Sequence, residues 1–257
     1  MKGLLVRIAC DQIYGGWNAP VDPSSLRFVY VPIPDNQDKH YRPGCSRSYE
    51  LFKEAVELFN RGLTPPASTS KPFPQGLLAR HPHLDPDFEK LTYGDNGASR
   101  GANIREMAPG DFIVFYAGLR PVNSAPGLIY AIVGFYVVER VSRAVDVPRE
   151  NWDDNAHTRW RRVSPVDVVV RAKPGVSGRL ERCMPIGEWR DRAYRVRHDI
   201  LTEWGGLTVK NGYIQRSARP PLFSDPGKFC RWFQKRDVRL IARNNAESLR
   251  RAFASTS

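Results

Sequence analysis

The sequence predicts an α/β fold in which a mixed central sheet with flanking helices forms a single compact domain over residues 1–257. Two long segments, 111–120 and 128–139, are rich in β-branched and aromatic residues and are separated by a turn that contains Pro and Gly. They are expected to pair as an antiparallel hairpin at the centre of the sheet. Apolar residues in 47–61 recur at spacings of three and four, which predicts an amphipathic helix.

The remaining predicted elements are shorter. Apolar runs predict further strands at 4–9, 26–33 and 166–170. Pro32 indicates that the second of these strands ends at an edge of the sheet or leaves it. A second helix is expected over 226–243, where apolar side chains gather on one side. Both helices are expected to cover the sheet.

Basic residues dominate the charge of the chain. Lys and Arg total 39 against 27 Asp and Glu, which gives a net charge of +12. Such an excess favours a polyanionic partner, with DNA as the first candidate, although a basic surface without a ligand remains open. We expect residues 1–140 to form the core of the domain and the Arg-rich residues 141–257 to contact DNA.

Several classes of protein are disfavoured by signals that the sequence lacks. No apolar run approaches the roughly 20 residues that cross a bilayer, and no signal peptide is recognisable, so we expect a cytoplasmic protein without membrane contact. The four cysteines are widely spaced, which argues against a zinc site built from cysteines. Walker, GxGxxG, HExxH and GxSxG motifs are absent, so no cofactor or metal is expected.

The first strand is followed by a carboxylate, a phenol and a pair of glycines, in the order Asp11-x-x-Tyr14-Gly15-Gly16. Glycine permits positive φ and a close approach by a ligand. A carboxylate at a strand tip is unusual in so basic a chain, and Asp11 is therefore our candidate catalytic group. The alternative is that Asp11 caps a turn or pairs with an arginine.

Aromatic and amide side chains are candidates for binding a base. Enzymes that act on a base commonly extrude it and hold it between aromatic faces. Tyr14 and Trp17 suit this role, and they suit the core equally well. The polar turn with Tyr93, Asp95 and Asn96 can read the hydrogen-bonding edge of a base, or it can be an Asx turn.

Small residues mark the end of the segment 111–120. Tyr116 and Arg120 bracket Ala117-Gly118, which leaves room for a ligand. Tyr116 is expected to line the base pocket and Arg120 to contact a phosphate. Alternatively, Gly118 marks only the bend into the following turn.

Basic and aromatic residues are interleaved in Arg159-Trp160-Arg161-Arg162. Such a mixture suits contacts to the DNA backbone together with a stacking or wedge residue, so these four residues are expected to bind DNA. In the alternative interpretation, Trp160 belongs to the core and the arginines are merely solvated.

A short segment upstream holds residue types that bind metals, namely His81, His83, Asp85 and Asp87. Two prolines lie among them, which leaves their mutual geometry undefined. We expect a solvated loop there rather than a metal site.

Five segments together resemble the nucleotide-modification-associated domain of the third type, a bacterial family proposed to act around modified DNA bases. They are Asp11-x-x-Tyr14-Gly15-Gly16, Val31-Pro32-Ile33-Pro34-Asp35, Leu84-Asp85-Pro86-Asp87, Leu91-Thr92-Tyr93-Gly94-Asp95 and the run 110–120. The resemblance covers roughly residues 4–140. It implies a partner, double-stranded DNA with modified bases, and a link to antiviral defence against phages.

The setting of Asp11 also resembles, more loosely, the first motif of the uracil-DNA glycosylase superfamily. There an acid after the first strand orients water and stabilises an oxocarbenium-like sugar, as in glycoside hydrolysis. The second motif of that superfamily, His-Pro-Ser near the C-terminus, is not evident here. The resemblance implies a monofunctional DNA glycosylase, a hydrolase that flips out and excises a modified base such as a hypermodified cytosine.

A function from another class remains open. The run 110–116, followed by a second long strand, resembles the small-barrel readers of the PUA-like group. On this alternative the protein is a non-catalytic reader that recognises modified bases in DNA.

Overall fold

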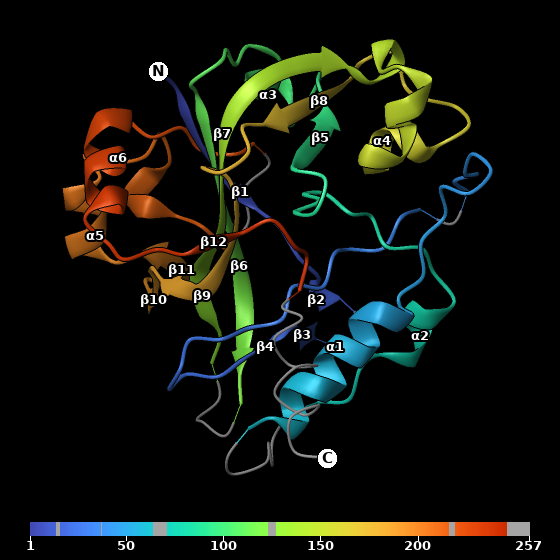
Figure 1. Cartoon of the computed structure of the whole chain (residues 1–257). Helices are drawn as coiled ribbons and strands as arrows, with labels where there is room; N and C mark the ends of the chain where they lie inside the picture. Colours follow the sequence, from blue (N-terminus) through green and yellow to red (C-terminus); the bar gives the residue numbers. More distant parts are fainter. Residues whose placement is uncertain (14–15, 37, 64–70, 123–126, 216–218, 246–257) are drawn as a thin grey trace.

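The structure is a computed structural model that describes residues 1–13, 16–36, 38–63, 71–122, 127–215 and 219–245, with residues 11–13 described in their backbone alone. It confirms the predicted class, because a mixed central sheet is flanked by helices (Figure 1). None of the described helices is long and apolar enough to cross a bilayer.

The main sheet has the strand order β1-β6-β7-β8-β5. These strands are β1 (Gly3–Arg7), β6 (Phe112–Pro121), β7 (Ile129–Arg143), β8 (Asp167–Ala172) and β5 (Thr92–Asn96). β1 runs parallel to β6, and the other pairs along this path are antiparallel. Three further strands branch from it, namely β4 (Pro20–Val21), β9 (Gly178–Pro185) and β12 (Leu240–Ile241).

The hairpin of β6 and β7 is the centre of this sheet, as predicted. Its register runs from Phe112 opposite Val137 to Leu119 opposite Ile129. Nearly every residue of β6 is buried, which is expected of a strand that is covered on both faces. The β-branched and aromatic residues that predicted the hairpin thus supply both of its packed faces.

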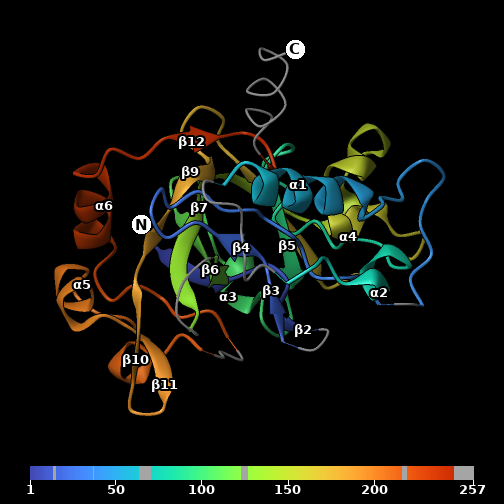
Figure 2. The ribbon, with the colours of Figure 1, turned by 90° about the horizontal axis from the view of Figure 1, so that it is seen from below.

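Alternate side chains of β6 enter two separate cores, one on each face of the sheet. The first core contains Phe115 of β6 together with the buried side of helix α1 (Glu50–Arg61). The second contains Phe112 of β6 together with α5 (His198–Glu203) and α6 (Pro226–Gln234). Figures 1 and 2 show α1 on one side of the sheet and α5 with α6 on the other.

Short elements fill the connections. The helices are α2 (Gln75–Leu78), α3 (Ala102–Arg105), α4 (Ala156–Arg159) and the 3-10 helices η1 (Ala144–Asp146), η2 (Arg149–Asp154) and η3 (Lys210–Gly212). The small strands pair as β2 (Asp11–Ile13) with β3 (Trp17–Asn18), and as β10 (Gly187–Arg190) with β11 (Ala193–Val196). The composition of these segments gave little periodic signal, and we did not predict them.

The strand expected at 26–33 is wrong. Val29, Tyr30 and Val31 are buried as expected, but they pair with no single neighbouring strand. Val29 N donates to Pro20 O, and Val31 O accepts from Cys10 N. Prolines at 32 and 34 limit a regular ladder, so the backbone groups are satisfied one at a time by different segments.

The second predicted helix is shorter than expected. Helix α6 ends at Gln234, and its predicted C-terminal part instead includes β12. In β12, Leu240 pairs with Leu180 of β9. The described strands form no closed sheet, which a PUA-like barrel requires, so that architecture is not present.

The packing of the second core can be tested at the aromatic cluster around Phe229. Phe229 is fully buried, and its ring centroid lies 4.2 Å from that of Phe223 and 5.3 Å from that of Trp204. We expect Phe229→Ala to lower the free energy of unfolding by about 3–5 kcal/mol in urea denaturation, because it leaves a large cavity. Leu51→Ala, on the exposed side of α1, is the control. If Phe229→Ala lowered the free energy of unfolding by no more than Leu51→Ala, the packing described for the second core would be wrong.

Candidate functional site

Two segments far apart in sequence bring Asp35 and His83 together. The backbone of residues 33–35 pairs with that of residues 81–83, since Asp35 N donates to His81 O and His83 N donates to Ile33 O. The bridge between Pro34 and Pro82 lies at the centre of this pairing. It places the His83 imidazole against the Asp35 carboxylate, with Nδ1 and Oδ1 separated by 2.7 Å.

A second imidazole comes from α4, which lies beside β5 (Figure 1). Asn155 caps this short helix by accepting a hydrogen bond from His157 N at 2.9 Å. The same amide donates from Nδ2 to Asp85 Oδ1 at 3.0 Å. The cap therefore positions His157 and Asp85 relative to each other. His157 Nδ1 lies 2.6 Å from Asp167 Oδ2, at the start of β8.

The remaining nitrogens of the two imidazoles lie close to one oxygen of Asp85. Nε2 of His157 is 3.2 Å from Asp85 Oδ2, and Nε2 of His83 is 3.5 Å from it. The other oxygen, Oδ1, accepts from Gly94 N at 2.6 Å and from the Asn155 amide. The ligand atoms of His83, Asp85 and His157 all lie within 4.8 Å of one another, so these three residues can hold a metal ion.

Gly94 of β5 allows this cluster to pack against the sheet. A Cβ at this position would lie 2.7 Å from Asn155 Oδ1 and 2.7 Å from His157 Cδ2. It would also lie 3.2 Å from Asp85 Oδ2. Only glycine therefore permits the approach of the cluster to the strand.

Burial and charge shift the pKa values of the site in different directions. Burial lowers the pKa of His157, but its hydrogen bond with Asp167 and the charge of Asp85 outweigh that effect and raise the pKa to about 10. Burial acts to raise the pKa of Asp85, but the two imidazoles hold it below its ordinary value. For Asp95, burial raises the pKa, and the Arg100 guanidinium at 3.9 Å only partly offsets the rise.

The cluster lies at a cavity of about 370 Å³. This cavity is lined by His83, Asp85 and His157. It is also lined by three residues that were predicted from the sequence to read a base, namely Tyr93, Asp95 and Asn96. An adjoining hollow of about 320 Å³ also contacts both imidazoles and is lined by Trp160 and Lys39. The structure thus joins the predicted base-binding turn to a histidine–carboxylate cluster.

The other predicted base-binding residues are not at this cavity. Trp17 is buried in the first core, edge-on to Phe73, and Tyr116 is buried in the second core, where its hydroxyl donates to Ile214 O. Tyr14 and the side chain of Asp11 lie outside the described part of the structure. The backbone of Asp11 pairs with that of Asn18. Asp11 follows two residues after Ala9, and Ala9 lines the cavity.

The basic residues expected to bind DNA divide into buried and exposed groups. Arg159 is buried, and its guanidinium pairs with Asp87 at 2.8 Å and with Asp153 at 3.3 Å. It is not placed to contact DNA, contrary to our expectation, because charge in a sequence does not report burial. Arg161 and Arg162 are exposed, and Arg120 is partly exposed with Nη2 3.4 Å from Gly16 O.

Trp160 is also buried, as the alternative interpretation of that segment allowed. Its ring stacks on the imidazole of His83 with centroids 5.7 Å apart, and its Nε1 donates to Asp35 Oδ2 at 3.3 Å. Lys39 Nζ lies 3.8 Å from the ring centroid of Trp160. Trp160 therefore holds the cluster in place.

The solvated loop expected around residues 81–87 is wrong. Asp85 and Asp87 are buried, His83 is largely covered, and His81 is exposed. Sequence reasoning missed His157 and Asp167 as members of the cluster, as well as Asp35. No spacing motif could have found them, because their partners come from distant segments that only the fold brings together.

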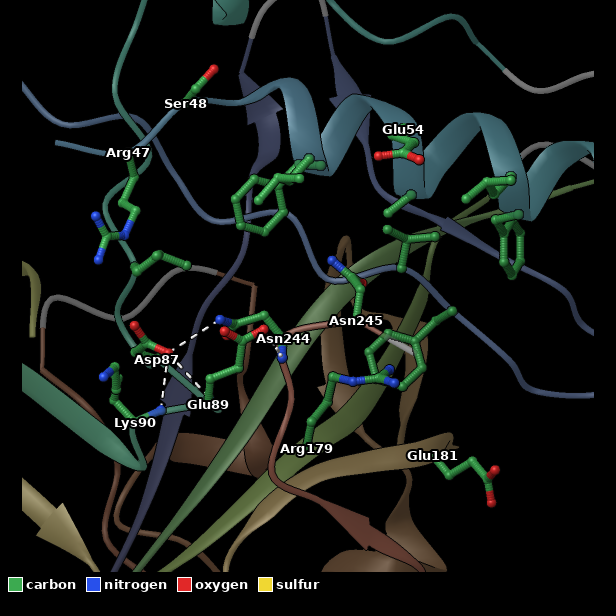
Figure 3. Close-up of a pocket in the computed structure, with 18 of the residues that line it drawn as sticks. Arg47, Ser48, Glu54, Asp87, Glu89, Lys90, Arg179, Glu181, Asn244 and Asn245 are labelled. Atoms are coloured by element: carbon green, nitrogen blue, oxygen red, sulfur yellow. Dashed lines mark hydrogen bonds between the residues drawn. The ribbon is translucent and has the colours of Figure 1, made fainter. Parts of the chain in front are cut away.

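A second cavity, of about 390 Å³, lies between α1 and the C-terminal segment (Figure 3). Several of its polar groups bond to one another. Asp87 Oδ1 accepts from the amide of Asn244 at 3.1 Å and from the backbone of Glu89 and Lys90. Arg179 lies over the Phe28 ring, and its Nε and Nη1 find no hydrogen-bond partner among the described residues. This cavity has no imidazole in its described lining, so we place the functional site at the histidine cluster.

The two groups of arginines make different predictions. We expect Arg159→Ala to lower the free energy of unfolding by about 3–5 kcal/mol, because it leaves Asp87 buried without its cation. Arg161→Ala should change it by less than about 0.5 kcal/mol. It should instead weaken DNA binding and reduce the slope of log K against log salt by about 1. Urea denaturation measures the stability, and titrations with duplex DNA at several salt concentrations measure the binding. If Arg161→Ala destabilised the fold and Arg159→Ala weakened only DNA binding, the assignment of the buried and the exposed arginine would be wrong.

Comparison with known proteins adds one match. The family model described as nucleotide modification associated domain 3 matches residues 2–237, which spans both the core and most of the Arg-rich portion. No curated protein and no solved structure matches significantly, and the resemblance to uracil-DNA glycosylases is not confirmed. The match covers most of the chain, including every residue of the histidine cluster, and the chain therefore belongs to the nucleotide modification associated domain 3 family.

Proposed function

We propose that the protein is an enzyme that hydrolyses the N-glycosidic bond of a modified base in double-stranded DNA, with the cavity beside β5 as its active site. The family indicates an involvement with modified nucleotides. The observation that carries the proposal is the composition of the cavity. Its lining combines Tyr93, Asp95 and Asn96, which suit recognition of a base, with the Asp85 carboxylate between two imidazoles.

The two carboxyl groups of the cavity suit the two halves of such a reaction. Asp95, whose pKa is raised by burial, is the general acid that gives its proton to the departing base. Asp85, whose pKa is held low, keeps its negative charge and stabilises the positive charge that develops on the sugar. The C–N bond breaks, the oxygen of a water molecule joins the sugar carbon, and a proton from that water restores Asp95.

The surroundings of the cavity suit a base that has been flipped out of a duplex. Arg161 and Arg162 are exposed beside Trp160, which lines the adjoining hollow together with Lys39. Arginines in that position can hold the phosphates while the extruded base enters the cavity. The net charge of +12 supports attraction to DNA as a whole. A hypermodified cytosine, as found in phage DNA, is the substrate class to test first, and a role in defence against phages is part of the proposal.

Asp11 keeps a place in this proposal. Its backbone follows Ile8 and Ala9, which line the cavity, so the strand β2 begins near the site. Asp11 is then a second candidate, beside Asp85, for stabilising the sugar cation. Comparing the rates of base excision by Asp11→Asn and Asp85→Asn will show which of the two carboxylates has this role.

The proposal is tested with duplexes that carry one modified or one plain cytosine, followed by alkali to cleave abasic sites. We expect scission at the modified base alone, and we expect Asp95→Asn to slow it by about 10²–10⁴-fold, the usual contribution of a general acid. Binding of the duplex should persist in this variant. Asp199→Asn, an exposed carboxylate on α5, is the matched control and should cleave at the wild-type rate.

Two outcomes would overturn the proposal. Binding of modified duplexes without scission on any of them would identify a reader, and the enzyme assignment would fail. Scission that is unaffected by Asp95→Asn would move the active site away from this cavity.

A further inference from the structure

We infer that His83, Asp85 and His157 form a binding site for a divalent first-row transition ion, such as Zn²⁺ or Fe²⁺, whose open coordination positions face the cavity. The inference about binding is independent of the proposed reaction. Only the role of the ion in catalysis rests on the proposed function.

The distances between the three groups match those around such an ion. Metal–nitrogen and metal–oxygen bonds of about 2.0–2.2 Å put tetrahedral neighbours about 3.4 Å apart. Asp85 Oδ2 lies 3.2 Å from His157 Nε2 and 3.5 Å from His83 Nε2. The full set spans no more than 4.8 Å, so small rotations of the imidazoles bring all three atoms onto one ion.

The orientation of the imidazoles is the second observation. Each ring uses its Nδ1 to bond a buried carboxylate, Asp35 for His83 and Asp167 for His157. Such a partner fixes the orientation of the ring, so that Nε2 becomes a metal ligand when binding of the ion displaces its proton. Asp35 is itself held by the Tyr41 hydroxyl and by Trp160 Nε1. Both imidazoles thus direct the same ring nitrogen toward one carboxylate oxygen, an arrangement that a simple ion pair does not require.

The Asp85 carboxylate provides a third, independent observation. Oδ1 accepts two N–H groups, whereas Oδ2 accepts no hydrogen bond within the described part of the chain, although only 3% of the side chain is exposed. The two imidazoles face Oδ2 as ion-pair partners, but neither Nε2 makes a hydrogen bond of acceptable geometry to it. A buried carboxylate oxygen that accepts no hydrogen bond is rare and requires an explanation. A cation bound at Oδ2 supplies it.

The ligand set indicates the class of ion. Two imidazole nitrogens and one carboxylate oxygen suit zinc, iron and neighbouring metals, whereas Mg²⁺ and Ca²⁺ prefer oxygen alone. Three protein ligands leave one or more positions for water or substrate, which is typical of catalytic rather than structural sites. Here these positions open toward Asp95 and Asn96, which line the same cavity. If the proposed hydrolysis holds, the ion would bind and acidify the water that attacks the sugar, with Asp85 as its ligand, and stabilisation of the sugar cation would then pass to the second candidate, Asp11.

The direct test is metal binding by the full chain, without DNA. The protein is stripped with a chelator, titrated with Co²⁺ under anaerobic conditions and followed by visible absorption and elemental analysis. We expect one equivalent of Co²⁺ with a d–d spectrum of four- to six-coordinate nitrogen and oxygen ligation, displaced by Zn²⁺. Asp167→Asn, which weakens the support of His157, should lower the affinity about 10–100-fold.

Matched variants separate the site from adventitious binding. His83→Ala and Asp85→Asn should abolish the spectrum, while His81→Ala, an exposed histidine of the same segment, should retain it. Thermal unfolding of each variant checks that it is folded. If the stripped wild-type protein takes up no stoichiometric Co²⁺ or Zn²⁺, or if His83→Ala binds as the wild type does, the inference is wrong. Metal binding without base excision would instead leave the site standing and reject the glycosylase.

Discussion

The carboxylate of Asp85 is the interaction on which the rest of the site depends. Through Oδ1 it joins the backbone of β5 at Gly94 to the Asn155 amide that caps α4. Through Oδ2 it faces both imidazoles. The segment around residue 85, the nearby strand β5 and the helix α4, which is distant in sequence, are thereby fixed against one another. Their meeting point at Asp85 forms part of the wall of the cavity.

Such a cluster is costly to bury, which bears on why the chain has it. Asp35, Asp85 and Asp167 are each less than 10% exposed, and a buried carboxylate is tolerated only when it is paired or bound to a cation. Buried ion pairs of this kind are seldom more stable than apolar residues of the same size. The hydrophobic cores on the two faces of the sheet already account for the fold. The cluster is therefore better explained by what it binds or catalyses than by stability.

The elements that the sequence predicted are those whose signal is local. The β6–β7 hairpin and α1 follow from periodicity within a single segment, and Tyr93, Asp95 and Asn96 from one polar turn. The histidine cluster as a whole has no such signal, because its members come from four separate segments. The prediction that Arg159 contacts DNA was wrong for a related reason. Its partner in the buried ion pair, Asp87, lies 72 positions away in the chain. Charge and residue type can be read from a sequence, but the partner of a buried charge cannot.

Acidic and basic side chains are paired within the cavity, and this pairing constrains what can enter. The walls of the two adjoining hollows carry four carboxyl groups, those of Asp35, Asp85, Asp95 and Asp167, and also Arg7, Arg100, Lys39 and the two imidazoles. Asp95 faces Arg100, and the other three carboxylates face the imidazoles. The exposed Arg161 and Arg162, in a chain of net charge +12, have no such acidic neighbours in the sequence and are the better place for phosphates. On the proposed function, the cavity therefore offers hydrogen-bonding groups of both kinds to the edge of an extruded base, while the backbone of the DNA stays on the basic surface.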